Sequence, residues 1–419
     1  MGIPYIIPLS ATSRFLATQL STENCIPHII LPKNNLKYFL KNGSSISYNN
    51  QISSTNYFKR THKFPSSSFQ YLQNKYKVDS NNNPISIFIP SSQLNKFSIS
   101  DDNNIFIPPP NSDIFIINPY FGQIENYQQK LSKYYNNKID SIHSKSKPRF
   151  WSLISNHLVT NGTFWDINHK GIGELKITYI PFNYIEASSN EIINSSQIIK
   201  QIFQTPTLLP IIYSYSNINL LLIEQMIIQS SISLINHIEF LPIYQNLKNN
   251  SSLSSENEID IYFDKRIKLK KLIYDLINES VKVLKEHPIV KHYIKLTPTY
   301  LATLSEERLF NIVLNLIYSD KVVSSISNNI NPLNEIIKRK KFVKLNLKEN
   351  EKLNKKNESL VDKYNNNNNN NNKSEYDNII HLRDFAKFNR HISKLGSTFG
   401  IKTPKNKLVC RLLDTQNKV

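Results

Sequence analysis

Two kinds of hydrophobic periodicity divide the chain, and together they constrain its fold more than any other feature. Up to about residue 185, short apolar runs alternate with segments of helical spacing; the runs cover residues 3–9, 28–31, 85–89, 105–107 and 113–117. Continuous apolar runs of this length are typical of strands buried on both faces of a parallel sheet. Strands that alternate with helices predict an α/β domain.

Beyond about residue 186 the apolar residues recur at helical spacing. The predicted helices cover residues 191–203, 219–236, 265–286 and 306–319. Residues 379–413 predict two more helices, because Gly400 ends one and Pro404 begins the next. The most apolar stretch, residues 211–241, contains Glu224 and His237, which favours a buried helix pair over a membrane span.

We therefore predict two domains: a Rossmann-like α/β domain over residues 1–185 and an all-helical domain over residues 186–419. Three Ser- and Asn-rich stretches, residues 50–83, 246–260 and 324–378, are interpreted as insertions. The last contains eight consecutive asparagines, residues 365–372, and is predicted to be disordered, because it buries too little apolar area to offset its ordering entropy.

The composition excludes some classes of protein. The chain has two cysteines, Cys25 and Cys410, too few for a disulfide framework or a cysteine-built zinc site. Lys and Arg number 51 against 32 Asp and Glu, so the net charge is +19 and the chain attracts anions such as nucleic acid.

Three motifs resemble those of the ketopantoate reductases, in the same order along the chain. The first is the amino-terminal strand and turn over residues 3–13. The second, His169-Lys-Gly-Ile-Gly173, resembles a Gly-rich His-x-Gly-x-Gly element. The third, Gly400-Ile-Lys-Thr-Pro-Lys-Asn406, resembles a helix junction and follows Asn389. The resemblance implies a reductase fold with a cleft between its two domains.

The turn after the first strand departs from the reductase pattern. The resemblance places the three glycines of a G-x-G-x-x-G turn at Pro8, Ser10 and Ser13, and a 2′-phosphate contact near Lys33. Glycines let the backbone approach a dinucleotide pyrophosphate at a helix N-terminus. Proline has no N–H and serine adds a side chain, so we expect the chain to bind no dinucleotide cofactor.

The catalytic positions that the resemblance implies are also replaced. An ungapped match puts Gln225 at the position of the reductase lysine and Gln229 at that of an asparagine, and the late catalytic glutamate falls near Asp384. An amide cannot act as the general acid that protonates a developing alkoxide. We expect a reductase-like chain that is not an enzyme.

The eroded turn and the missing lysine are similar to those of the yeast mitochondrial translational activators of cytochrome b messenger RNA. This resemblance implies action at the 5′ leader of that messenger on the small subunit of the mitochondrial ribosome. It also implies a matrix-side, peripheral association with the inner membrane, with no transmembrane segment. Residues 1–22 contain one arginine, Arg14, and no acidic residue, so the mitochondrial location follows from the resemblance.

Two basic segments are candidate contacts for RNA or the ribosome. The first lies on a predicted helix and consists of Lys265, Arg266, Lys268, Lys270 and Lys271. The second lies in the predicted disordered insertion and consists of Lys338, Arg339, Lys340 and Lys341. The pattern of the first segment slightly favours a solvated helix face, and that of the second is equally compatible with a solvated linker.

His169 is interpreted as shaping a strand turn, in preference to a remnant of substrate or cofactor contacts. His237 is interpreted as a core residue of an apolar helix, because no second His or Cys lies at metal-ligand spacing, and we expect no metal site. Two further functions stay open at this point. The chain could be an NADPH-dependent ketopantoate reductase with a divergent site, or a structural protein of the mitochondrial ribosome. The former would oxidise NADPH with ketopantoate, and loss of the latter would lower all mitochondrial translation products.

Overall fold

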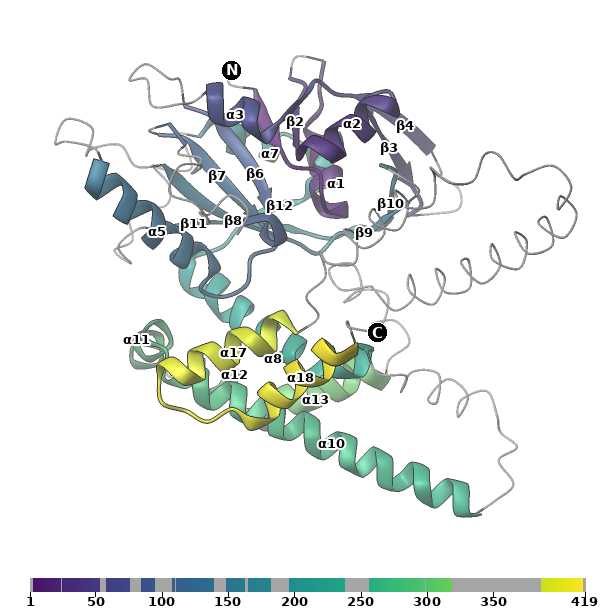
Figure 1. Ribbon diagram of the computed structural model, residues 1–419, viewed down its shortest axis with the longest axis vertical. Coiled ribbons are helices and arrows are strands. Elements are labelled where there is room, and N and C mark those ends of the chain that lie inside the picture. The colour runs from purple at the N-terminus through teal and green to yellow at the C-terminus, as the bar shows by residue number, and fades with distance from the viewer. Residues whose placement is uncertain are drawn as a thin grey trace, which may run out of the picture. The chain divides into compact units, whose positions relative to one another are not determined.

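The structure is a computed structural model, drawn in Figure 1. It describes residues 3–23, 25–52, 58–75, 84–94, 108–109, 111–138, 148–162, 165–181, 196–237, 256–297, 299–318 and 386–416. The chain divides into two compact units, Met1–Leu222 and Ile223–Val419. The predicted run 105–107, the insertion 324–378 and Asp384 lie outside the described residues.

In the described part of the first unit, one eight-stranded sheet has the order β12-β11-β8-β7-β6-β1-β2-β5. The strands are β1 Pro4–Ile6, β2 His28–Leu31, β5 Ser66–Ser68, β6 Ser86–Pro90, β7 Asp113–Ile117, β8 Arg149–Ser155, β11 Leu175–Ile180 and β12 Pro210–Ile212. The six neighbouring strands β8, β7, β6, β1, β2 and β5 are parallel, and β11 is antiparallel to β8. In chain order the parallel strands lie 3-2-1-4-5-6, which is the order of a Rossmann sheet.

Helices connect these parallel strands. They are α1 Ala11–Leu20, α2 Lys33–Lys41, α3 Phe69–Lys75 and α5 Gln123–Lys138, with α7 Gln197–Phe203 after the last long strand. The observed β2 and β7 match the predicted apolar runs 28–31 and 113–117 residue for residue. All of β7 is buried, and its Phe115 ring stacks on Phe88 of β6 at 4.5 Å and lies 5.8 Å from Trp151 of β8. Burial on both faces explains why these strands read as continuous apolar runs.

A second sheet of four strands has the order β4-β3-β10-β9. Its strands are β3 Ser45–Asn50, β4 Phe58–Lys63, β9 Leu158–Asn161 and β10 Ile167–Gly171. Phe15 of α1 lies against one face of this sheet, 6.1 Å from the Tyr48 ring and 4.7 Å from His169. The interpretation of residues 50–83 as an insertion is wrong in its described part, which supplies β4 to the small sheet and β5 to the large sheet and also forms helix α3.

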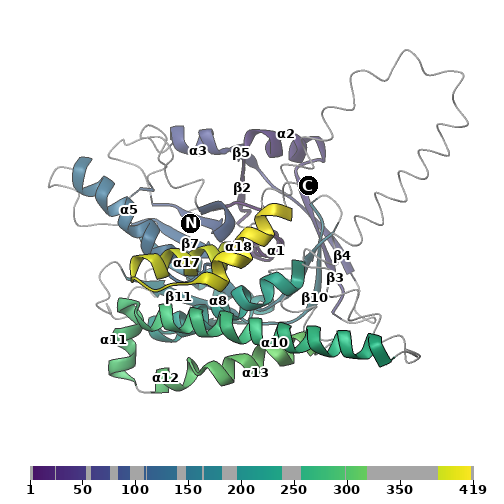
Figure 2. The same ribbon diagram turned by 60° about the horizontal axis from the view of Figure 1, so that its bottom comes forward.

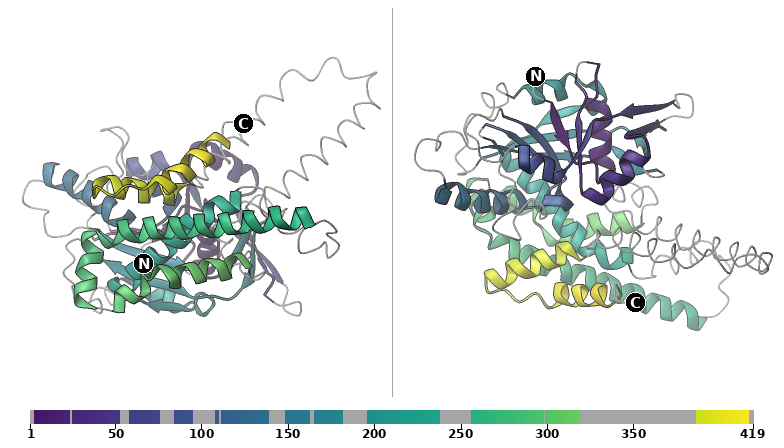
Figure 3. Two further views of the ribbon diagram at one scale, coloured as in Figure 1. Left: turned by 90° about the horizontal axis from the view of Figure 1, so that it is seen from below. Right: turned by 45° about the horizontal axis from the view of Figure 1, so that its top comes forward.

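The second unit is helical in its described part. Its helices are the later part of α8 Tyr215–His237, then α10 Glu256–Lys285, α11 Pro288–Leu296, α12 Thr299–Thr303, α13 Glu306–Tyr318, α17 Lys387–Thr398 and α18 Pro404–Gln416. Figures 2 and 3 show α10 beside α13, and it also contacts α17 and α18. Gly400 has a φ of +72°, and Pro404 opens α18, as the sequence predicts.

Two details differ from the sequence expectations. The apolar stretch 211–241 is not a helix pair, because Ile211 and Ile212 pair with Lys176 and Ile177 in the sheet and a single helix, α8, follows. Since β12 belongs to the large sheet, the first unit extends past the predicted boundary at residue 185 to Leu222. None of the helices in the described ranges is long and apolar enough to cross a bilayer.

Candidate functional site

The place to look for a ligand in such a sheet is the edge formed by the carboxyl ends of the parallel strands. Ligands bind there, where the strand order reverses, which in this chain lies between β1 and β6. The turn after β1 contains Pro8 and Ser10, and α1 begins at Ala11 with Ser10 as its N-cap. The predicted strand, turn and helix are therefore present, and the chemistry of the turn decides what they can bind.

Ser10 and Ser13 close this turn on themselves. The Ser13 backbone N–H donates to Ser10 Oγ at 3.1 Å, and the Ser10 backbone N–H donates to Ser13 Oγ at 3.0 Å. The Ser10 hydroxyl also donates to Ser13 Oγ at 2.9 Å, and the Ser13 hydroxyl to the Ser10 carbonyl at 2.9 Å. This is a capping box, and it uses two backbone N–H groups at the point where a pyrophosphate would need them.

Pro8 and Arg14 reinforce the closed turn. Pro8 has no N–H to offer, and its carbonyl accepts a hydrogen bond of 2.9 Å from Arg14 Nε. The Arg14 guanidinium lies over the Trp165 ring, 4.8 Å from its centroid. The Arg14 side chain therefore contacts both the turn after β1 and Trp165, which lies just before β10, so its guanidinium interacts with protein groups.

The neighbouring loops at this edge are also held by protein groups. Asn118, which follows β7, has a φ of +50°; its Nδ2 donates to Thr12 Oγ1 at 3.4 Å and its Oδ1 accepts from the Ser155 N–H at 3.0 Å. Gln123 Nε2 donates to the Ser91 carbonyl at 2.8 Å, and its Oε1 accepts from the Tyr120 N–H at 3.2 Å. The polar side chains of this edge thus tie the loops to one another.

His169 belongs to a buried polar cluster under α1. Its Nδ1 lies 2.9 Å from the Tyr48 hydroxyl, and its Nε2 lies 3.3 Å from Nδ1 of His157. His157 Nε2 in turn lies 3.0 Å from the Leu208 carbonyl. Burial, with the neighbouring His157, lowers the pKa of His169 to about 4, so the ring is neutral at neutral pH. This placement fits the structural interpretation of His169.

The second glycine of the His-x-Gly-x-Gly element, Gly173, lies where the backbone leaves no room for a side chain. A Cβ on Gly173 would lie 2.4 Å from the Asn156 backbone and 2.6 Å from the His157 nitrogen. The Gly173 N–H also faces His157 Nδ1 at 3.3 Å. Gly173 is therefore required by a close backbone approach that positions the histidine cluster.

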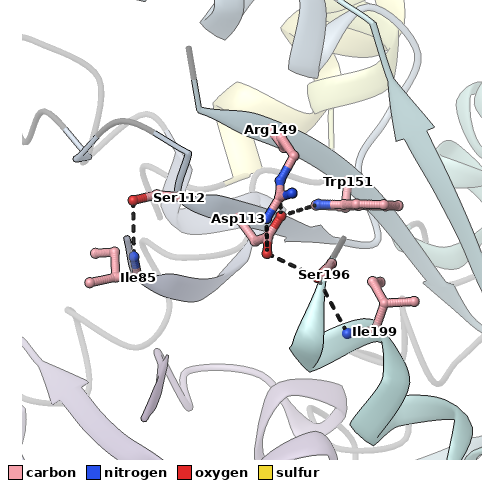
Figure 4. Close-up of polar contacts among 7 residues, drawn as sticks. All are labelled: Ile85, Ser112, Asp113, Arg149, Trp151, Ser196 and Ile199. Carbon is pink, nitrogen blue, oxygen red and sulfur yellow. Dashed lines mark hydrogen bonds and ion pairs between the residues drawn. The ribbon is translucent and has the colours of Figure 1, made fainter. Parts of the chain in front are cut away.

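A buried charged network lies at the opposite ends of the strands (Figure 4). Asp113 begins β7 and accepts hydrogen bonds from Arg149 Nε at 2.7 Å, Arg149 Nη2 at 2.9 Å, Trp151 Nε1 at 2.9 Å and Ser196 Oγ at 2.9 Å. Because this is the amino-terminal edge of the parallel strands, the network lies away from the ligand-binding edge. It joins β7, β8 and the start of α7, and its role is structural.

In the second unit, the two amides that the resemblance places at catalytic positions lie on α8. Gln225 and Gln229 are both half-buried and lie about one helical turn apart. The adjacent Glu224 pairs with Arg308 of α13 at 3.2 Å. Asp384, the acid that the resemblance assigns to catalysis, lies outside the described residues.

The motif around Asn406 forms a buried network that the sequence only partly suggested. Asn389 Nδ2 donates to Asn406 Oδ1 at 3.0 Å. Glu279 of α10, which sequence reasoning missed, accepts from the backbone N–H groups of Lys405 and Asn406 at 2.8 and 3.0 Å. A carboxylate at the first turn of α18 satisfies free N–H groups and interacts favourably with the helix dipole.

The structure describes only some of the basic side chains that the sequence predicts to contact RNA or the ribosome. Lys270 and Lys271 are exposed on α10. The backbone of Lys265, Arg266 and Lys268 continues the same helix, and their side chains lie outside the described part. Lys338, Arg339, Lys340 and Lys341 lie outside it as well. Within the described residues, no group of three or more His, Cys, Asp or Glu is placed to hold a metal ion.

Comparison with known proteins gives the fold type. No protein-family model and no curated protein matches the chain. Among solved structures, a D-mandelate dehydrogenase bound to NADH and anilino(oxo)acetate matches with a TM-score of 0.53 and 10% identity, over 100% of this chain and 99% of that one. A PanE/ApbA family ketopantoate reductase from Ralstonia eutropha matches with a TM-score of 0.52 and 10% identity, over 100% of both chains. The predicted fold class, a Rossmann-like domain with a helical domain of the ketopantoate reductase type, is confirmed.

Proposed function

We propose that this chain uses the ketopantoate-reductase fold without the reductase reaction and activates translation of the mitochondrial cytochrome b messenger. The observation that carries the first half is the Ser10–Ser13 capping box at the turn after β1. The second half follows from the resemblance to the yeast activators. In this role the chain acts at the 5′ leader and the small ribosomal subunit, on the matrix side of the inner membrane.

The turn supports loss of dinucleotide binding. A pyrophosphate at α1 would have to displace the Ser10 hydroxyl from the Ser13 N–H, and it would meet the Ser13 side chain, which is fully buried. Removing such a cap costs about 1 kcal/mol before any new contact is made. Pro8 offers no replacement N–H, and its carbonyl would repel a phosphate.

The position of Gln225 supports loss of catalysis. Reduction of a carbonyl needs a group that delivers a proton to the developing alkoxide. A glutamine amide donates a hydrogen bond but keeps its protons at any physiological pH. With Gln225 and Gln229 on the same helix, the resemblance leaves α8 without the reductase lysine.

A surplus of positive charge supports a nucleic-acid partner. The net charge of +19 raises the local concentration of polyanions and speeds their association. Exposed lysines occur on both units, including Lys59 and Lys63 in the first and Lys270 and Lys271 in the second. Lysine contacts to phosphate position a partner without reading its sequence, so a second partner such as the ribosome would supply selectivity.

The test is pulse-labelling of mitochondrial translation products in cells that lack this chain, with the cytochrome b transcript quantified in parallel. We expect newly made cytochrome b to disappear while its transcript persists, and re-expression of the wild-type chain to restore it. A loss of all mitochondrial products would instead identify a ribosomal component. Unchanged products would overturn the proposed activation.

A separate titration tests the absence of reductase chemistry. NADPH is added to the purified full-length chain while tryptophan fluorescence is recorded, since Trp151 and Trp165 both lie in the first unit. We expect no saturable quenching and no NADPH oxidation with ketopantoate. Saturable binding with turnover would favour the alternative, a reductase with a divergent site, for which the Rossmann strand order is the supporting observation.

A further inference from the structure

The small sheet has a face that differs in character from the rest of the first unit. Its inner face carries Ile46, Tyr48 and His169 and lies against α1. Since side chains alternate along a strand, the outer face of β3 and β4 carries Ser45, Ser47, Asn49, Lys59, Thr61 and Lys63. The last three, which lie on β4, are exposed. These two strands contribute no apolar side chain to the outer face.

Hydrogen bonds across the strands hold this outer face together. The Ser47 and Thr61 hydroxyl oxygens lie 3.2 Å apart between β3 and β4. Asn49 Nδ2 donates to Asn168 Oδ1 at 2.9 Å between β3 and β10. Asn49 itself is buried, so the polar surface consists of hydroxyls and the Asn168 amide, with the ammonium groups of Lys59, Lys63 and Lys170 around them. Such a surface suits a hydrated, charged partner and does not suit an apolar one.

The charge of this region is strongly one-sided. No Asp or Glu occurs between Glu23 and Asp79, a stretch that contains Lys33, Lys37, Lys41, Lys59, Arg60, Lys63, Lys75 and Lys77. The acidic side chain known to reach the outer face is Asp166, whose Oδ2 lies 3.7 Å from Lys59 Nζ. An ion pair of this length near the surface contributes little to stability. Lys59, whose side chain is 51% exposed, can therefore leave Asp166 and bind a phosphate instead.

The opposite face of β4 carries an aromatic ring and an arginine, because the register places Phe58 beside Asn50 and Arg60 beside Tyr48. Lys59 and Lys63 lie on the other face of the same strand, and the two faces meet at its free edge. Phe58 is 38% exposed, and the Arg60 guanidinium lies over its ring, 5.0 Å from the centroid. In the described part of the chain, β4 ends its sheet and has no further strand beside it. Lysines on an edge strand also prevent pairing with other chains. The exposed Phe58 ring and the Arg60 guanidinium above it do not prevent strand pairing. They do suit the stacking of a nucleic-acid base.

We propose that single-stranded RNA follows the free edge of β4, with phosphates at Lys59 and Lys63 on the outer face and a base against Phe58 and Arg60 on the opposite face. Naming RNA as the partner rests on the proposed function. Lys59 and Lys63 are four residues apart, which separates their Cα atoms by about 13 Å along an extended strand. The two ammonium groups therefore contact phosphates of different nucleotides. A membrane surface fits less well, because an interfacial site needs a buried apolar face beside its cations.

The test measures binding of a fluorescent single-stranded oligouridine to the full-length chain by anisotropy over a salt series. The K59E/K63E variant is compared with K394E/K407E, which makes the same charge change at exposed positions of α17 and α18. We expect K59E/K63E to weaken binding about tenfold or more and to reduce the slope of log K against log salt by about 1.4. The K394E/K407E control should stay within about twofold.

A third variant, F58A, separates stacking from charge. It should weaken binding about fivefold to tenfold at every salt concentration and leave the slope unchanged, since it removes a stacking partner and no cation. Melting curves of all variants show whether each is folded. Equal effects of the two charge variants would overturn the proposed site. A loss confined to anionic phosphatidylserine vesicles, with RNA binding intact, would overturn it in favour of a membrane surface.

The outcome is independent of the pulse-labelling result. Oligouridine binding that depends on Lys59 and Lys63, in a chain whose absence leaves cytochrome b synthesis unchanged, retains the site and removes the proposed function. Cytochrome b synthesis that depends on the chain but survives K59E/K63E, with unchanged oligouridine affinity, removes the site alone.

Discussion

Asn389 and Asn406 meet through their side-chain amides, and both are fully buried. Asn389 Nδ2 donates to Asn406 Oδ1 at 3.0 Å and to the Ser230 carbonyl at 2.9 Å. Asn406 Nδ2 donates to Glu279 Oε2 at 3.0 Å. This short series of contacts joins α17, α18, α8 and α10, so two asparagines hold four helices of the second unit in register.

Replacing Asn389 by leucine should destabilise the second unit by about 2–4 kcal/mol, because Asn406 and the Ser230 carbonyl lose a buried donor. Urea unfolding followed by far-UV circular dichroism measures the change. The matched control is Lys394→Ala on the exposed side of α17, for which we expect a change within about 0.5 kcal/mol. Equal effects of the two substitutions would contradict a structural role for Asn389.

Substitutions at Ser10 should distinguish a cap from a phosphate site. Ser10→Ala should lower the free energy of unfolding by about 1 kcal/mol, whereas Ser10→Gly should cost only a few tenths, about 0.3 kcal/mol, because glycine is also tolerated at an N-cap. Neither should change NADPH binding. Thermal unfolding and the fluorescence titration measure the two effects, and a larger loss from glycine than from alanine would refute the capping role.

Removing the Asp113 carboxylate should be costly, because Arg149 would keep its charge in a partly buried site. We expect Asp113→Asn to lower the free energy of unfolding by about 3–5 kcal/mol and to shift the emission of Trp151, whose indole N–H loses its acceptor. The control is Glu174→Gln in the same unit, whose exposed carboxylate lies 3.9 Å from Lys176 and whose replacement should cost less than about 1 kcal/mol. A small effect of Asp113→Asn would mean that the asparagine reproduces the network.

Acid should destabilise the first unit through its buried histidines. The folded state lowers the pKa of His169 to about 4, below its ordinary value of 6.5, so the unfolded chain takes up a proton first as the pH falls. The contribution of His169 to stability is therefore complete above pH about 6.5 and is lost towards pH about 4, by about 1–3 kcal/mol in all.

Urea unfolding at a series of pH values checks this prediction. His169→Gln should flatten the dependence of stability on pH between about 6.5 and 4. The control, His292→Gln on the exposed side of α11, should retain the wild-type dependence. If both variants keep the wild-type slope, the acid sensitivity arises at other groups, such as His287, whose pKa burial also lowers to about 4.

Two glycines should respond differently to alanine. At Gly173 the added Cβ would overlap the Asn156 and His157 backbone, so Gly173→Ala should cost more than about 2 kcal/mol. At Gly43 nothing lies within 4 Å, and only the φ of +75° opposes a side chain, so Gly43→Ala should cost about 1 kcal/mol. Calorimetric melting of both variants tests the order, and the reverse order would contradict the close approach at Gly173.

The buried strands of the large sheet could be predicted because burial on both faces makes a strand uniformly apolar. Residues 28–31 and 113–117 correspond to β2 and β7 for this reason. The edge strand β4 could not be found in this way, since Phe58–Lys63 is exposed, charged and not alternating. β12 was hidden for the opposite reason: its isoleucines continue into the apolar start of α8, and only pairing with β11 separates them.

The candidate site was predictable only at the level of single residues. Absence of glycine at Pro8, Ser10 and Ser13 can be read from the sequence, and so can the serine pair three residues apart. The contact between Asn118 and Thr12 joins residues 106 positions apart, and no local pattern announces it. The role of Glu279 could not be predicted for the same reason. The backbone N–H groups that donate hydrogen bonds to it belong to residues 126 and 127 positions later in the chain.

The large sheet ends in a strand of three residues on each side, β5 at one edge and β12 at the other. A strand this short exposes few free backbone groups, and Pro210 removes one N–H from β12. A growing aggregate needs a longer template to add a new strand. A chain rich in isoleucine, with a sheet core as apolar as β7, is thereby protected from edge-to-edge polymerisation of this sheet during folding.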